Sequence, residues 1–248
     1  MNSWVNIKAI TKRELGAYFS SPLAYVFIVI FLLLCGFFTF MVGGFFERGK
    51  ASLVRPFFDW HPWFYLFLVP AVGMRLWAEE RRVGTIELLL TMPITAWQAI
   101  LGKFLASWLF LGLALVLTFP IWITVNYLGS PDNGVILCGY LGSWLMAGAY
   151  LSISCFTSAM TRTQVVSFIV SVVLCLFLIL AGFPPVIKLL ENWAAPWLVD
   201  IVTSFSVMRH FEGFQRGVLD SRDIIFFLSV MVFSLFTTSA ILRGHRAG

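Results

Sequence analysis

The chain has 248 residues, of which 60% are hydrophobic, 17% aromatic and only 12% charged. A soluble domain carries about 25% charged residues, which it needs to cover its surface, so this composition excludes a water-soluble globular domain. Six windows of roughly 18 or more residues are nearly free of charge, and about 20 apolar residues cross a hydrocarbon core about 30 Å thick. The net charge of +5 does not indicate nucleic-acid binding, because the basic residues gather at the ends of these windows, where lipid headgroups lie.

The first segment, 1–20, predicts an amphipathic helix that lies in the membrane interface. It lacks the apolar core and cleavage site of a signal peptide, so we expect the first span to remain in the membrane. Thr11 and Glu14 interrupt its apolar stripe, and Pro22 separates it from the first span. The side chains that project roughly to one side are Trp4, Ile7, Leu15, Tyr18 and Phe19.

The six apolar windows predict an all-α integral membrane protein with six transmembrane helices in a single permease domain, 1–248. Pro70 is expected to kink the second span, and the spacing of Thr95 and Gln98 predicts a capping box that starts the third helix after Pro93. The extracytoplasmic segment 184–222 is too polar to span and predicts short re-entrant or interfacial helices. The predicted spans are 23–45, 60–78, 99–128, 135–160, 165–183 and 223–242.

Three small residues, Gly139, Ser143 and Ala147, follow one another at four-residue spacing in the fourth span. Such a stripe lets transmembrane helices approach closely. It predicts a helix-packing face, which is either an intrachain contact or the seam of a dimer.

The distribution of charge predicts that both termini are cytoplasmic. The side that holds the termini carries ten of the 17 basic and four of the 12 acidic residues, a net charge of +6. The other side carries seven basic and eight acidic residues, a net charge of −1. Cytoplasmic loops are enriched in lysine and arginine, so the more positive side is assigned to the cytoplasm.

The motifs of several function classes are missing from the sequence. No GxxxxGK[ST] motif is present, so ATP is not expected to bind this chain, and no HExxH pair indicates a catalytic metal. His61, His210 and His245 are expected to be solvated or interfacial groups. None of the 12 acidic residues lies at mid-membrane depth, where an ion-coupled carrier needs one. We therefore expect no cofactor on this chain and no catalytic residue.

One conspicuous charged segment, 79–98, lies between the second and third spans on the predicted cytoplasmic side. Gly84 is expected to change the direction of the chain, and Thr85 is suited to cap a new helix after it. Glu87 would lie in the first turn of that helix, where the helix dipole favours a negative charge. A short amphipathic helix at the membrane surface offers a soluble partner a docking element. The alternative is a solvated loop that follows the positive-inside rule.

The residues of this segment resemble the loop between helices two and three in permeases of the type 2 ABC exporter superfamily, which contains their coupling helix. A second stretch, from Ser206 to Asp223, resembles the gliding-motility branch of that superfamily. The residues that carry the first resemblance are Glu79, Glu80, Arg81, Gly84, Thr85, Glu87, Leu88, Leu89 and Pro93, followed by Gly102 and Lys103. The resemblance assigns ATPase coupling to Glu79, Glu80, Arg81, Arg82, Gly84, Thr85, Glu87, Leu88 and Pro93.

The resemblance implies a permease in the cytoplasmic membrane of a bacterium, working as a homodimer or heterodimer with two copies of a separate ABC ATPase subunit. ATP and magnesium would be bound by that partner, and the segment 79–98 would lie in a groove of it. An extracytoplasmic accessory protein and membrane lipid are further partners. Members of the superfamily move sugars, lipids, drugs and ions, and these residues do not select among them.

Two other functions compete with export. In the first, the chain is a mechanotransmitting or scaffolding subunit that acts on an envelope partner through 184–222 without moving a substrate. In the second, it is a lipid-modifying or proteolytic membrane enzyme, which needs a paired nucleophile and base at one depth. The sequence offers no such pair.

Overall fold

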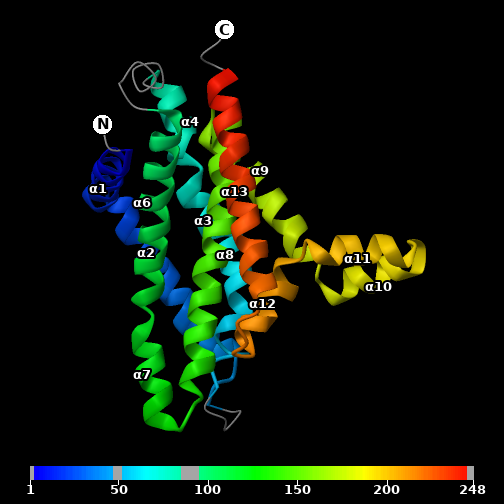
Figure 1. The fold of residues 1–248 in the computed structure, drawn as a ribbon. Coiled ribbons are helices and arrows are strands. Elements are labelled where there is room, and N and C mark those ends of the chain that lie inside the picture. Colours follow the sequence, from blue (N-terminus) through cyan, green and yellow to red (C-terminus); the bar gives the residue numbers. More distant parts are fainter. Residues whose placement is uncertain (1–2, 47–51, 85–94, 245–248) are drawn as a thin grey trace.

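The computed structural model describes residues 3–46, 52–84 and 95–244. The regular structure within these ranges is entirely helical, which confirms the predicted all-α class. The helices form an elongated bundle around α8 (Asn133–Met160), in which every residue from Leu145 to Cys155 is buried (Figure 1). A helix that is apolar or small on all sides suits this central position, because neighbouring helices cover every face of it.

The first helix, α1 (Ser3–Ser20), lies beside the bundle near the end where α13 finishes, and α2 (Pro22–Phe37) descends from it (Figure 1). The chain turns at Ser21, whose side chain accepts a hydrogen bond from the Leu23 amide, and Pro22 occupies the first helical position, which needs no amide donor. The helix continues as a π-helical turn, η1 (Phe38–Val42), and ends at Gly43, where the backbone of Pro56 leaves no room for a Cβ atom.

The second predicted span consists of two helices, α3 (His61–Gly73) and α4 (Arg75–Val83), separated at Met74. A short 3-10 turn, η2 (Phe58–Trp60), precedes them. Pro70 lies four residues before the break, where the sequence predicts a kink. The hydroxyl of Ser158 in α8 accepts hydrogen bonds from the amides of Trp77 and Ala78, both at 3.0 Å, and donates to the Met74 carbonyl at 2.8 Å. This one side chain therefore satisfies three backbone groups at the break.

The third predicted span begins as α6 (Ala96–Val116) and continues as α7 (Phe119–Leu128). The predicted capping box is confirmed: the Thr95 hydroxyl accepts a hydrogen bond from the Gln98 amide, and the Gln98 side chain accepts one from the Thr95 amide. The break at Leu117–Thr118, which the sequence analysis did not predict, precedes Pro120 at the start of α7. Proline is tolerated in the first turn of a helix and not in its interior.

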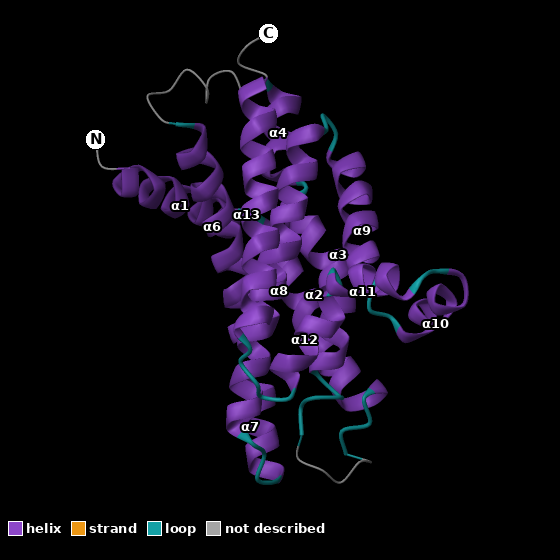
Figure 2. Ribbon diagram, turned by 45° about the vertical axis from the view of Figure 1, so that its right-hand side comes forward, coloured by secondary structure: helices purple, strands orange, loops and turns teal. Residues whose placement is uncertain are grey.

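The last part of the chain runs through α9 (Gln164–Leu180), three short helices and α13 (Ser221–Gly244). The short helices are α10 (Pro184–Trp193), α11 (Pro196–Ser204) and α12 (Val207–Gln215). The pair α10–α11 stands away from the bundle, whereas α12 packs against it (Figure 1, Figure 2). The described part of 184–222 thus contains short helices, as its polar and apolar pattern predicts.

Four described helical segments are long and apolar enough to cross a membrane: Pro22–Val42, Ala96–Leu128, Asn133–Met160 and Ser221–Gly244. A fifth is obtained if α9 and Pro184–Asn192, which meet at an angle of 71°, count as one span. The predicted span at 60–78 does not join them, because the break at Met74 divides it into helices of 13 and nine residues. The count of six therefore stays a prediction.

Candidate coupling site

A buried lysine on α6 joins three helices at one end of the bundle. The side chain of Lys103 is only 5% exposed, and its ammonium nitrogen lies 3.1 Å from Glu80 Oε1 in α4 and 3.3 Å from Glu14 Oε2 in α1. The same nitrogen lies 5.8 Å from the centre of the Trp77 ring, within the range of a cation–π interaction. A buried charge needs such partners, because water no longer solvates it.

These contacts join Glu80, which lies within the predicted coupling segment 79–98, to Lys103, which follows it. The end of α4, the start of α6, α1 and the end of α13 lie at the same end of the bundle (Figure 1, Figure 2). α4 ends at Gly84, whose φ of 77° is the left-handed conformation in which glycine commonly ends a helix. Lys103 therefore connects α4, which ends before residues 85–94, to α6, which begins after them.

The helix α1 is held against α6 by close packing and hydrogen bonds. At Gly102, a Cβ atom would lie 2.5 Å from the Ile10 side chain, so glycine permits the approach of the two helices. The Thr11 hydroxyl donates to the carbonyl oxygens of Ile7 at 2.9 Å and Gly102 at 3.3 Å. The side-chain amide of Asn6 donates a hydrogen bond to Gln98 Oε1 at 3.3 Å.

Tyr18 makes further contacts between α1 and α6. Its hydroxyl lies 2.9 Å from the Ser107 hydroxyl, and its ring stacks on Phe110 with centroids 4.9 Å apart. Burial raises the pKa of Tyr18 to about 12, so the phenol stays neutral and takes part in hydrogen bonds without a charge. The contacts from Asn6 to Tyr18 thus fix α1 along α6 from Gln98 to Phe110.

The remaining predicted coupling residues within the described chain lie on α4. Glu79 and Arg82 form an exposed ion pair at 2.6 Å, and Arg81 donates to the Met160 carbonyl at 3.4 Å. Burial, followed by repulsion from Arg162, lowers the pKa of Arg81 below its usual value. Residues 79–83 are thus helical rather than part of a loop. Four of the predicted residues lie outside the described chain: Thr85, Glu87, Leu88 and Pro93.

The small-residue stripe of α8 faces other helices of the same chain. A Cβ atom on Gly139 would lie 2.6 Å from the Phe58 ring, the Ser143 hydroxyl lies 2.8 Å from His61 Nδ1, and Ala147 is buried. The expectation that His61 is solvated or interfacial is wrong, since this side chain is 0% exposed. Its imidazole stacks on Tyr65 with centroids 5.4 Å apart, and Ser143 supplies the polar partner that a buried imidazole needs.

Glu14 is the site residue to which the sequence analysis gave no role. The interruption that Glu14 makes in the apolar stripe of α1 is the signal in the sequence that points to it. The sequence does not predict the burial of Lys103 or its two acidic partners. Within the described ranges, no group of three or more histidine, cysteine, aspartate or glutamate side chains is placed to hold a metal ion.

A comparison with protein families matches residues 63–212 to the ABC-2 family transporter proteins, which is more than half of the chain. A search of the curated proteins found no match. The matched range begins in α3 and ends in α12, so it includes the ion pair between Lys103 and Glu80 as well as the segment between α4 and α6. The apolar helices make the chain a multi-pass membrane protein, and members of this family are membrane transport subunits rather than ATPases. The chain belongs to the ABC-2 family of transporter proteins and is a permease component of an ABC transporter.

Proposed function

We propose that the chain is the membrane-spanning permease subunit of an ABC exporter whose ATP is hydrolysed by a separate subunit. Two permeases, identical or different, would assemble with two ATPase subunits, which would bind the ATP and magnesium. The observation that carries this proposal is the double ion pair of Lys103, because it links both helices that flank the segment 85–94 to α1. A segment attached in this way is suited to transmit a movement to the bundle.

The mechanism follows from the connections of α4. A force on 85–94 acts on the end of α4 and the start of α6, and the ion pair between Glu80 and Lys103 couples the two helices. α4 is in turn joined to α8 by Ser158 at the break after Gly73. A hydrogen-bonded break between two helices is a position where a small rotation is taken up. ATP binding to the partner would then favour one of two permease conformations through differential contacts.

The proposed location is the cytoplasmic membrane of a bacterium, with both termini and 85–94 in the cytoplasm. The excess of basic residues on that side supports this orientation. Within the superfamily, the stretch from Ser206 to Asp223 supports assignment to the gliding-motility branch. In this part of the chain, His210 Nδ1 lies 2.7 Å from Asp223 Oδ1, an ion pair when the imidazole is protonated.

A second candidate function is mechanical action on an envelope partner. It is favoured by the pair α10–α11, which stands away from the bundle and leaves Leu189, Trp197 and Phe205 each about 60% exposed (Figure 1). Exposed apolar side chains on a projecting element are typical of a contact with protein or lipid. Substrate movement by purified complex in vesicles would favour export, whereas ATP turnover without any substrate movement would favour the mechanical role.

Substitution of two glutamates tests the coupling role of this region. Glu80→Ala removes a partner of Lys103, and Glu87→Ala removes a charge from the predicted coupling helix. We expect both variants to insert normally and to lose ATPase binding or coupled ATP turnover. Glu191→Ala, an exposed position in α10, is the control and should behave as the wild type. Unchanged partner binding and turnover in both test variants would defeat the assignment.

A further inference from the structure

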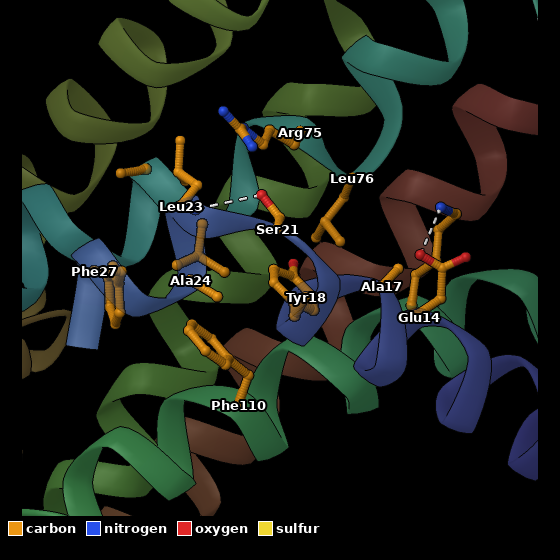
Figure 3. Close-up of a pocket in the computed structure, with 13 residues that line it drawn as sticks. Glu14, Ala17, Tyr18, Ser21, Leu23, Ala24, Phe27, Arg75, Leu76 and Phe110 are labelled. Carbon is orange, nitrogen blue, oxygen red and sulfur yellow. Dashed lines mark hydrogen bonds and ion pairs between the residues drawn. The ribbon is translucent and has the colours of Figure 1, made fainter.

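A cavity of about 170 Å³ lies beside α1, where α2, the break between α3 and α4, and α6 meet (Figure 3). Its lining has one polar part and one apolar part. The polar side chains include Glu14, Tyr18, Ser21, Arg75 and Lys103, and the apolar side chains include Leu23, Ala24, Phe27, Leu76 and Phe110. This division resembles that of a lipid molecule rather than that of a purely apolar or purely polar ligand.

The two cations that line the cavity differ in their surroundings. Lys103 is neutralised by Glu14 and Glu80. Arg75, at the first position of α4, forms no ion pair with an acidic residue of the described chain, and its Nε atom is buried without a hydrogen-bond partner. A buried donor that lacks a partner costs free energy and calls for a bound group that accepts its hydrogen. Of the two cations in the lining, Arg75 is the one without an acidic partner in the described chain, so an anion is the ligand that complements it.

The position of the cavity identifies the kind of anion. Figure 3 shows Arg75 next to Ser21 and Leu23, at the turn from α1 into α2, with Glu14 on the opposite side. From this turn, the outward side of α2 exposes Leu23, Val26 and Ile30, each between 44% and 54% exposed. A cavity of this size cannot enclose a whole phospholipid, but acyl chains can lie along this exposed side of α2.

We propose that this cavity binds the phosphate group of a phospholipid from the leaflet in which α1 lies, with the Arg75 guanidinium as its principal partner. The planar guanidinium matches a phosphate with paired hydrogen bonds, and arginine at a membrane interface readily reaches headgroups. Tyr18 and Ser21 line the same cavity. The bound lipid would support the break between α3 and α4. The proposal does not depend on coupling to an ATPase.

The test measures lipid binding to the purified full-length protein. The delipidated protein in detergent is titrated with phosphatidylglycerol, and native mass spectrometry gives the bound fraction for wild type, Arg75→Gln and Arg75→Lys. Loss of charged hydrogen bonds is expected to weaken binding by at least about tenfold in Arg75→Gln, with a smaller loss in Arg75→Lys. Arg243→Gln, an exposed cation in the last turn of α13, is the matched control and should bind as the wild type.

Equal affinity of Arg75→Gln and wild type would overturn the proposal. Equal weakening by Arg75→Gln and Arg243→Gln would also overturn it, because it would show nonspecific attraction of lipid to positive charge. Glycerol 3-phosphate, added as a competitor, separates a lipid from a free phosphate. We expect it to displace phosphatidylglycerol only at far higher concentration, and displacement at equal concentration would contradict a lipid ligand.

Discussion

Lys103 and Glu80 are 23 positions apart in the sequence, yet their charged atoms lie 3.1 Å apart and join α6 to α4. The pair connects the helix that precedes the segment 85–94 to the helix that follows it. Glu14 in α1 lies 3.3 Å from the same ammonium group, so α1 is joined to both helices.

Lys103→Met removes the cation from both carboxylates. Glu14 and Glu80, whose side chains are 19% and 23% exposed, then lose the cation that they share. We expect a loss of about 1–3 kcal/mol in stability, below the value for a fully buried pair because water still reaches the carboxylates. The midpoint of thermal unfolding in detergent measures the loss. Lys188→Met, an exposed position in α10, should leave the midpoint unchanged, and an equal shift in both variants would argue against a specific pair.

The energetic link between α4 and α6 is measured by a double-mutant cycle on Glu80→Gln and Lys103→Met. Because the two groups are in direct contact, the double variant should lose less stability than the sum of the single variants, by about 0.5–2 kcal/mol. The free energy of unfolding of the four proteins gives this coupling energy. Strict additivity would mean that the observed ion pair contributes no interaction energy.

Gly102→Ala tests the contact between α1 and α6. The added methyl group would meet the Ile10 side chain at 2.5 Å, so α1 must move or strain must be accepted. We expect destabilisation of about 1–3 kcal/mol, a cost typical of overpacking. Thermal unfolding reports the change, together with faster proteolysis within α1. Gly16→Ala, in the partner helix α1, is the matched control, since no atom lies near its Cβ position, and it should be neutral or stabilising. The same result for both glycines would contradict the contact.

Ser158→Ala tests the hydrogen bonds at the break between α3 and α4. It leaves the amides of Trp77 and Ala78 without the hydroxyl that accepts from them. The expected cost is about 1–3 kcal/mol, the typical penalty for buried donors without partners. Hydrogen exchange of the α4 amides should accelerate in this variant. Ser229→Ala, whose exposed hydroxyl bonds only within α13, provides the comparison, and unchanged exchange in Ser158→Ala would remove the proposed role of this residue.

Features set by neighbouring residues could be predicted from the sequence. The capping box of Thr95 and Gln98 depends on residues three positions apart and has the expected form. Gly84 breaks the chain direction as predicted, although the helix that it ends was expected only as far as residue 78. Apolar composition alone predicts the all-α membrane class, because the lipid core demands internally bonded backbone.

Features that depend on distant contacts could not be predicted. His61 is buried because Ser143, 82 positions away, supplies a hydrogen bond, and no local pattern contains that information. Lys103 has one partner in α1 and one in α4, and the interrupted stripe at Glu14 gave only an indirect signal. The break at Met74 is bridged by Ser158, which lies 84 positions further along the chain.

Purification of the tagged protein in mild detergent from its native membranes, followed by mass spectrometry, tests the central claim most directly. A permease coupled through 79–98 predicts a near-stoichiometric ATP-binding subunit in the wild-type preparation. The same subunit should be lost when residues 79–87 are replaced, while insertion of the permease is retained. Absence of any nucleotide-binding protein, under conditions that keep other exporters whole, would contradict the account.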